Sequence, residues 1–418
     1  MSKLDVAIDL IDNGEIEKGL EYLDQIKKGC TDEEKYTIAE NYYRWGFVDQ
    51  AKEIVELLHE FYPEEGELSL FLAEIMIDLD EEEDAIEVLA TITEEDPAYV
   101  QSLLLQGDLY QMQGLSEVSE RKLLLAKKKL PQEPIIDLAL AELYSSQGDF
   151  KKSIEYYNIV LDEHEVVAGI NVNSRIAESL SAAGEFEDAL PFYEKAIKAK
   201  EEIDTLFRYG FTAFQAGYYK TTIESLIKLK EIDHEYSSLY LYLSKAYEHE
   251  GMLEESYNTI VSGLKVDEFN KELQLYAGEV SMKVGRKENV EQHLREAIAL
   301  DPGYIEAVQM LTKFLLKEER YDEIIECIEQ VSSYGEFDPG YDWDLATAKN
   351  KLEQYSDALN HYRQAYTSFK DDIDFLEEYG YFLVEEGKRE EALIVFKRIL
   401  EIDPTKVEIE ETVNSFEL

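Results

Sequence analysis

Residues 141–163 read AELYSSQGDFKKSIEYYNIVLDE, and residues 177–197 read AESLSAAGEFEDALPFYEKAI. Both stretches begin with a small residue, place Gly seven positions later, and place a second small residue five positions after that Gly. A Gly between two amphipathic runs supplies the left-handed backbone of a tight turn. Each stretch therefore predicts two antiparallel helices that approach closely at their small residues.

The same pattern recurs about every 34 positions through almost the whole chain. The first small residues are Ala39, Ala73, Gly107, Ala141, Ala177, Gly210, Ser244, Gly278, Thr312, Ala346 and Gly380. The turn position holds Gly14, Gly46, Gly114, Gly148, Gly184, Gly217, Gly251, Gly285 and Gly387. Asp80, Glu319 and Glu353 replace this Gly in three repeats, where we expect distorted turns. One helix pair cannot bury its apolar side alone, so the period predicts a stacked solenoid.

These segments, together with GYFLVEEGKREEALIVFKRILEIDP at residues 380–404, closely resemble the tetratricopeptide repeat. The layout of the whole chain is also similar to that of the YpiA-type repeat proteins of low-GC Gram-positive bacteria. The resemblance implies an all-α fold, a right-handed superhelical solenoid of about twelve helix-turn-helix repeats.

We expect one repeat array over residues 1–406, followed by a capping segment over residues 407–418 that is helical from Lys406 to Phe416. The repeats are expected to start near residues 1, 32, 66, 100, 134, 170, 203, 237, 271, 305, 339 and 373. No β-sheet is expected within residues 32–404. A two-residue insertion near Val166–Asn171 and the stretch SSYGEFDPGYDW at residues 332–343 are expected to form irregular loops.

The chain has a formal net charge of −51, and residues 1–99 hold 7 basic against 29 acidic residues. Such a field repels phosphate backbones and anionic lipid surfaces, which argues against a nucleic acid partner. Two interpretations of the charge stay open. The acidic faces keep a long array in solution, or they attract a basic protein.

No pattern in the sequence indicates catalysis. The six His are scattered over different repeats, and no metal-binding or phosphate-binding motif occurs. We therefore expect no enzyme activity, no metal and no cofactor. Cys30 and Cys327 lie about nine repeats apart, which argues against a disulfide. The N-terminal sequence has no long apolar core, and no apolar run is long enough to span a membrane, so we expect a cytoplasmic protein.

The resemblance also implies which side chains face inward. In the tetratricopeptide repeat, positions 2, 5, 9 and 12 of each repeat line the concave face, when the first small residue is counted as position 8. Position 9 of the first six repeats is always acidic. These residues, which we call the acidic ladder, are Asp9, Glu40, Glu74, Asp108, Glu142 and Glu178. They are candidates for steering a Lys-rich or Arg-rich partner segment, and the alternative is a solvated acidic face.

The seventh repeat differs, because Phe207, Phe211 and Phe214 occupy positions 5, 9 and 12. Arg175, Arg208 and Lys245 are expected nearby, which makes a basic and aromatic cluster in an acidic chain. Such a cluster is typical of a partner-binding hot spot. In the alternative interpretation, the Phe rings pack between repeats while the Arg side chains neutralise carboxylates such as Glu178 and Asp204.

The sequence thus favours a non-enzymatic scaffold or adaptor that binds other proteins or peptide segments in its concave groove. The alternative is a regulatory, peptide-sensing repeat protein that lacks its own DNA-binding domain.

Overall fold

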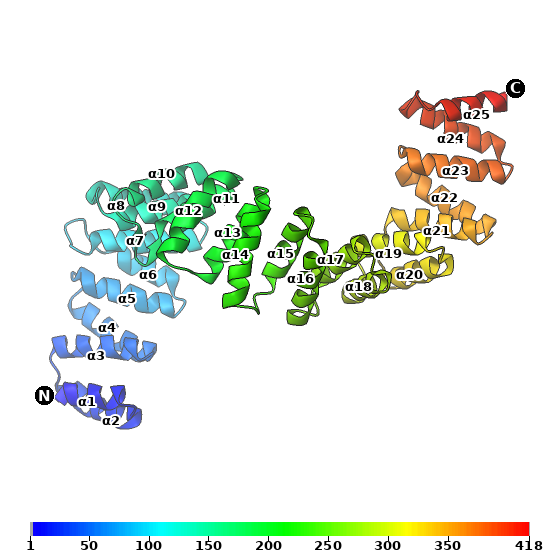
Figure 1. Cartoon of the computed structure of the whole chain (residues 1–418). Coiled ribbons are helices and arrows are strands. Elements are labelled where there is room, and N and C mark those ends of the chain that lie inside the picture. Colours follow the sequence, from blue (N-terminus) through cyan, green and yellow to red (C-terminus); the bar gives the residue numbers. More distant parts are fainter. Residues whose placement is uncertain (1–2, 418) are drawn as a thin grey trace. The chain divides into compact units, whose positions relative to one another are not determined.

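The computed structural model describes residues 3–417, and Figure 1 shows them as successive pairs of antiparallel helices. The helices of the first six pairs are α1 (Lys3–Asp12), α2 (Ile16–Ile26), α3 (Asp32–Arg44), α4 (Val48–Phe61), α5 (Gly66–Asp78), α6 (Glu82–Ala90), α7 (Tyr99–Met112), α8 (Ser116–Lys129), α9 (Pro134–Ser146), α10 (Phe150–Leu161), α11 (Val172–Ala182) and α12 (Phe186–Ala199). A short 3₁₀ helix, η1 (Lys27–Gly29), follows α2.

The remaining pairs and a final single helix are α13 (Ile203–Gln215), α14 (Tyr219–Ile232), α15 (Ser238–His249), α16 (Leu253–Val266), α17 (Lys271–Lys283), α18 (Lys287–Leu300), α19 (Ile305–Lys317), α20 (Tyr321–Ser333), α21 (Pro339–Lys351), α22 (Tyr355–Phe369), α23 (Ile373–Glu385), α24 (Arg389–Ile402) and α25 (Val407–Glu417). The described residues therefore contain twelve helix pairs plus α25. The predicted fold class, a helical repeat solenoid, is confirmed.

The chain divides into two compact units, residues 1–208 and residues 209–418. Within each unit, a helix packs mainly against the helices directly before and after it in the sequence. Stability therefore comes from interfaces between neighbouring helices rather than from one central core. The single array over residues 1–406 remains a prediction.

The two helices of a pair approach closely at the small residues. A Cβ atom added to Gly107 would lie 2.8 Å from Cδ2 of Leu123, which belongs to the second helix of the same pair. Fully buried Ala39 and Ala73 occupy the same position in earlier repeats. The period of small residues is thus a direct consequence of helix packing.

The turn between the two helices of a pair is left-handed even where Gly is missing. Gly148 has a φ of 77°, and the residues that replace the turn Gly have φ values of 59° at Asp80, 57° at Glu319 and 60° at Glu353. The expected distortion of these turns is therefore not seen in their φ values. The closing hydrogen bond is also kept, as the amide of Gln354 donates to the Lys349 carbonyl at 2.8 Å.

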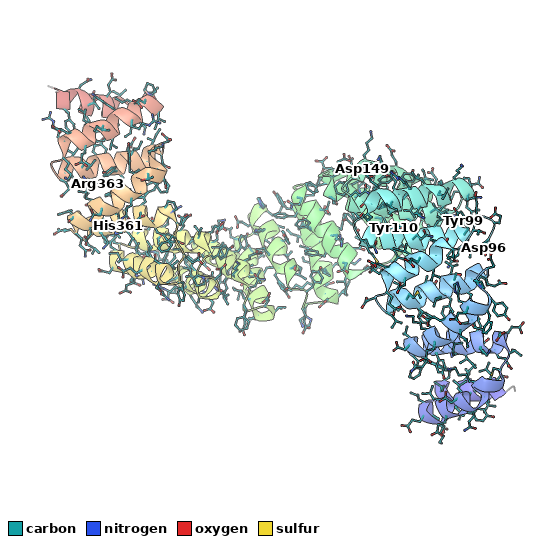
Figure 2. The ribbon with its side chains drawn as sticks, turned by 180° about the vertical axis from the view of Figure 1, so that it is seen from behind. Asp96, Tyr99, Tyr110, Asp149, His361 and Arg363 are labelled. Carbon is teal, nitrogen blue, oxygen red and sulfur yellow. The ribbon has the colours of Figure 1, made fainter. Side chains whose placement is uncertain are left out.

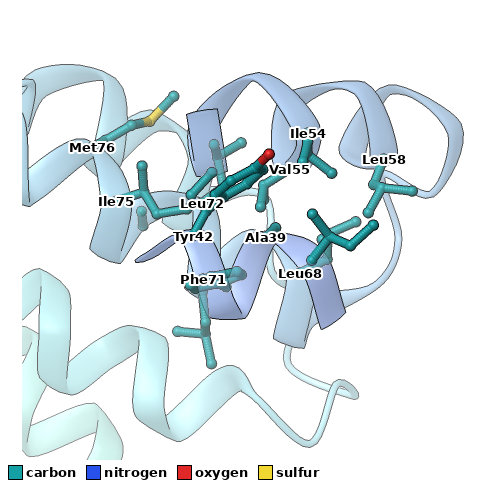
Figure 3. Packing of buried hydrophobic residues seen from close by; sticks show 14 of the residues in the cluster. Ala39, Tyr42, Ile54, Val55, Leu58, Leu68, Phe71, Leu72, Ile75 and Met76 are labelled. Carbon is teal, nitrogen blue, oxygen red and sulfur yellow. The ribbon is translucent and has the colours of Figure 1, made fainter. Parts of the chain in front are cut away.

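The core consists of clusters of buried apolar side chains between successive helices within each unit. Figure 3 shows the part formed by α3, α4 and α5, where Tyr42, Ile54 and Ile75 are buried. Polar groups join neighbouring repeats at their edges. Asp96, labelled in Figure 2, accepts hydrogen bonds from the amide of Gly66 at 3.2 Å and from that of Ala98 at 2.7 Å.

Two expectations about irregular segments are wrong in detail. Residues 166–171 form a small antiparallel hairpin of β1 (Val166–Val167) and β2 (Ile170–Asn171), so the expected absence of any β-sheet is incorrect. Ala168 and Gly169 have positive φ values of 49° and 81°, which close the hairpin. In the second segment, only residues 334–338 lie outside a helix, because Pro339 begins α21 as an N-terminal helix residue.

The last helix covers the apolar side of the pair before it. Ile409 and Val413 of α25 are 2% and 6% exposed, and they pack in the same cluster as Phe396 of α24. Aromatic contact adds to this, since the ring centroids of Phe396 and Phe416 lie 6.4 Å apart.

Candidate functional site

The first helices of successive repeats share hollows at the positions that the resemblance places on the inward face. A hollow of about 480 Å³ lies between α7 and α9. From α7, its walls include Leu104, Asp108 and Gln111, at positions 5, 9 and 12 of their repeat. From α9, they include Ile135, Leu138 and Glu142, at positions 2, 5 and 9 of the next repeat. Met112, at its edge, is 68% exposed. Acidic ladder residues and apolar side chains thus line the same hollow.

The acidic ladder is partly desolvated. Asp9, Glu40 and Asp108 are exposed, whereas Glu74 is half-buried. Desolvation, followed by repulsion from Asp78, raises the pKa of Glu74. Desolvation also raises the pKa of Asp108. This residue is exposed, but it also lines the hollow between α7 and α9.

The end of the ladder is neutralised by arginine. Arg175 lies between Glu142 and Glu178, with its Nε 3.0 Å from Glu142 Oε1 and its Nη1 2.9 Å from Glu178 Oε2. Arg208 approaches Glu178 more loosely, at 3.7 Å. These contacts match the alternative in which the two Arg side chains neutralise carboxylates.

The other four ladder residues keep their charge uncompensated. Among residues 3–417, no Lys, Arg or His nitrogen lies within 4 Å of the carboxylates of Asp9, Glu40, Glu74 or Asp108. The effective acidic ladder is therefore shorter than the sequence indicates.

A second, larger hollow lies further toward the N-terminus. It has a volume of about 870 Å³ and is lined by Asp32, Glu33, Tyr36, Tyr62 and Glu67, among others. The hydroxyl of Tyr62 donates to Asp32 at 2.8 Å, and burial together with neighbouring carboxylates raises the pKa of Tyr36. The acidic ladder was defined on position 9 alone and so did not include this hollow, although Glu33, Tyr36 and Glu67 stand at the inward positions 2, 5 and 2.

The predicted aromatic cluster is divided between the two units. Arg175, Phe207 and Arg208 belong to the first unit, and Phe207 is half-buried.

In the second unit, Phe211 and Phe214 pack edge-on against Tyr242, with centroid distances of 4.8 and 5.7 Å. Lys245 places its ammonium 5.4 Å from the ring centroid of Tyr276. Both Phe rings are half-buried, so they contribute to packing and still present part of their surface.

The described part of the chain shows neither a metal site nor a membrane span. Among residues 3–417, no group of three or more His, Cys, Asp or Glu side chains is placed to hold a metal ion. None of the helices described here is both long enough and apolar enough to cross a membrane.

The paired helices, the left-handed turns and the inward hollows define a tetratricopeptide repeat protein. A family model described as tetratricopeptide repeat matches residues 46–106. Models described as YpiA-like tetratricopeptide repeats and YpiA-like C-terminal tetratricopeptide repeats match residues 111–165 and 339–406.

The chain belongs to the YpiA-like family of tetratricopeptide repeat proteins. It is 51% identical over 407 residues to the TPR repeat-containing protein YpiA of Bacillus subtilis (strain 168). The alignment covers 97% of this chain and 96% of that relative.

Solved structures resemble the chain in its repeat fold alone. YrrB, described as a TPR protein with an unusual peptide-binding site, is 18% identical, with a TM-score of 0.40 over 45% of this chain and 96% of YrrB. A tetratricopeptide repeat protein from Parabacteroides merdae ATCC 43184 is 16% identical, with a TM-score of 0.42 over 60% of this chain and 99% of its own.

Proposed function

We propose that the chain is a non-enzymatic scaffold or adaptor whose first unit binds a basic segment of a partner protein along its inward face. The observation that carries this proposal is the run of four uncompensated carboxylates, Asp9, Glu40, Glu74 and Asp108. The last of them, Asp108, lines an inward hollow whose apolar surface includes the exposed Met112 and the half-buried Leu104 and Ile135. A segment that carries Lys or Arg next to apolar side chains is complementary to both features.

The two features have different effects on binding. Exposed charge pairs contribute only about 0 to 1 kcal/mol each, so the acidic ladder mainly accelerates and orients the encounter. Affinity comes from apolar contacts in the hollow between α7 and α9, where burying one partner side chain contributes about 1.5 to 3 kcal/mol. We further propose Arg175, Phe207 and Arg208 in the first unit, and Phe211, Phe214 and Lys245 in the second, as partner contacts.

Capture experiments with matched variants test this function. The full chain, immobilised as bait, is incubated with a native bacterial cell extract, and the bound proteins are identified by mass spectrometry. One variant combines Glu40→Gln, Glu74→Gln and Asp108→Asn. The control combines Glu60→Gln, Glu87→Gln and Glu155→Gln, exposed residues on the second helices of their pairs. Both variants lose the same net charge.

We expect a basic partner that is captured by the wild type and the control and is depleted with the acidic ladder variant. With the purified partner, association with the ladder variant should be slower by about tenfold, while helical content stays unchanged. A partner that associates equally fast with all three proteins contradicts the proposal and leaves the ladder as a solvated face.

A further inference from the structure

The second unit has an inward hollow of the opposite character. A hollow of about 730 Å³ is lined by residues from the end of α17, the start of α18 and the inward side of α19. Met282, Met310 and Phe314 supply its apolar surface, and Lys313 and Lys317 stand beside them. We call these five residues the lysine–methionine hollow. Met282 stands at position 12 of its repeat, and Lys313 stands at position 9 of the next. Both are inward positions, and position 9 is also the position of the acidic ladder.

The apolar part of this hollow is accessible and adaptable. Phe314 is only 9% exposed and lines the buried part of the hollow, whereas Met282 is 38% exposed and Met310 is half-buried. Unbranched Met side chains fit apolar partners of different shapes. An exposed Met at an inward position therefore provides a contact surface for an apolar side chain from another molecule.

The two lysines differ from the other Lys and Arg residues of α17 to α20, which all have an ionic partner. Eight basic residues lie on α17 to α20 and the turns between them, and six of these pair with carboxylates: Lys271, Lys283, Arg286, Lys287, Arg295 and Arg320. For Lys313 and Lys317, no carboxylate oxygen lies within 4 Å in the part of the chain that the structure describes, and both side chains are exposed. In a chain with 92 acidic and 41 basic residues, both uncompensated lysines of this region line one hollow.

In the part of the chain that the structure describes, the carboxylates around the hollow form no ion pair within 4 Å with these lysines. Glu318 is held by Lys287 at 2.6 Å, which closes one rim. Glu306 also lines the hollow and is exposed. Asp344 lies within electrostatic reach of Lys313, and the Asp344 carboxylate accepts a hydrogen bond from the Thr312 hydroxyl at 2.7 Å. Lys313 and Lys317 are one helical turn apart, so their ammonium groups can meet two carboxylates about 6 Å apart.

We propose that the lysine–methionine hollow docks an acidic segment of a partner protein, in which two carboxylates flank an apolar side chain. The carboxylates pair with Lys313 and Lys317, and the apolar side chain contacts Met282, Met310 and Phe314. This site differs from the proposed acidic ladder in position and in the charge of its ligand. The scaffold would then hold partner segments of opposite charge in its two units.

Fluorescence anisotropy with short labelled peptides tests this proposal on the full chain. The first probe has a Leu-Phe centre flanked by Glu residues on both sides. A second probe replaces every Glu by Lys, and a third keeps Glu but replaces Leu-Phe by Ser-Ser. The protein variants are Lys313→Gln with Lys317→Gln, and a control, Lys265→Gln with Lys370→Gln, at exposed lysines elsewhere in the second unit.

We expect the first probe to bind the wild type and the control equally, and to bind the Lys313 and Lys317 variant at least about tenfold more weakly. The second and third probes should bind weakly to all proteins. The acidic ladder variant should bind the first probe as the wild type does, which separates this result from the proposed function of the first unit. Loss of binding in both lysine variants, equal binding of the third probe, or no binding of the first probe each overturns the proposal.

Discussion

At the scale of single residues, the turn position determines how each helix pair closes. Nine turns use Gly, and Asp80, Glu319 and Glu353 take the same left-handed conformation with a side chain. A residue other than Gly in the left-handed conformation costs about 1 to 2 kcal/mol of folding free energy. Replacing it by Gly removes this cost, but Gly also has more conformational freedom in the unfolded chain, which offsets part of the gain. The three non-Gly turns are thus local weak points.

The combined variant Asp80→Gly, Glu319→Gly and Glu353→Gly should therefore be more stable than the wild type, by about 1 to 2 kcal/mol in total. Urea unfolding followed by circular dichroism measures the change as a higher midpoint. Lys351→Gly provides the control, since this residue ends α21 in helical conformation and the change should lower stability by about 1 kcal/mol. A lower midpoint in the triple variant would show that these turns carry no strain.

At the scale of helices, the contact between α13 and α15 bears on the two interpretations of Phe211 and Phe214, as packing residues or as partner contacts. The rings of Phe211 and Phe214 contact the ring of Tyr242, and the ring centroids of Phe214 and Tyr219 lie 5.6 Å apart. Because both rings are only half-buried, their removal should cost less than truncation of fully buried Phe, which costs about 3 to 5 kcal/mol each.

We expect Phe211→Ala combined with Phe214→Ala to lower the free energy of unfolding by about 2 to 4 kcal/mol. Thermal unfolding and partner capture should be measured on the same variant, with Phe269→Ala, a 72% exposed ring, as the control. A reduced melting temperature with unchanged capture supports packing alone. An unchanged melting temperature with weakened capture contradicts this expectation and identifies the rings as a partner anchor.

At the scale of the whole molecule, the net charge of −51 opposes the compact state. The uncompensated ladder carboxylates add to this repulsion, and the desolvation of Glu74 and Asp108 increases it. The large excess of negative charge therefore lowers the stability of the folded chain. This cost supports a binding role for the inward carboxylates in addition to solubility.

Salt should consequently stabilise the chain. Raising NaCl from 0.1 M to 1 M shortens the Debye length from about 10 Å to about 3 Å, so the melting temperature should rise by several degrees. The acidic ladder variant should melt higher than the wild type at low salt and gain less from added salt. A melting temperature that is independent of NaCl would show that ion pairs and repulsion cancel.

The sequence by itself determined the repeat and the order of the helices. These features depend on local spacing: Gly at the turn, small residues where helices meet, and a helical period of apolar side chains. For the same reason, the hairpin of residues 166–171 was missed, because two short strands that pair across Ala168 and Gly169 leave almost no periodic signal.

Only the tertiary structure decided which inward side chains act together. The pairing of Arg175 with Glu142 and Glu178 shortens the acidic ladder, and the contact with Tyr242 partly buries Phe211. The hollow that joins Met282 to Lys313 likewise depends on two neighbouring repeats. Each of these features arises where side chains from different repeats meet. Period and spacing specify the face on which a residue lies, but the partner it meets there depends on how the repeats stack.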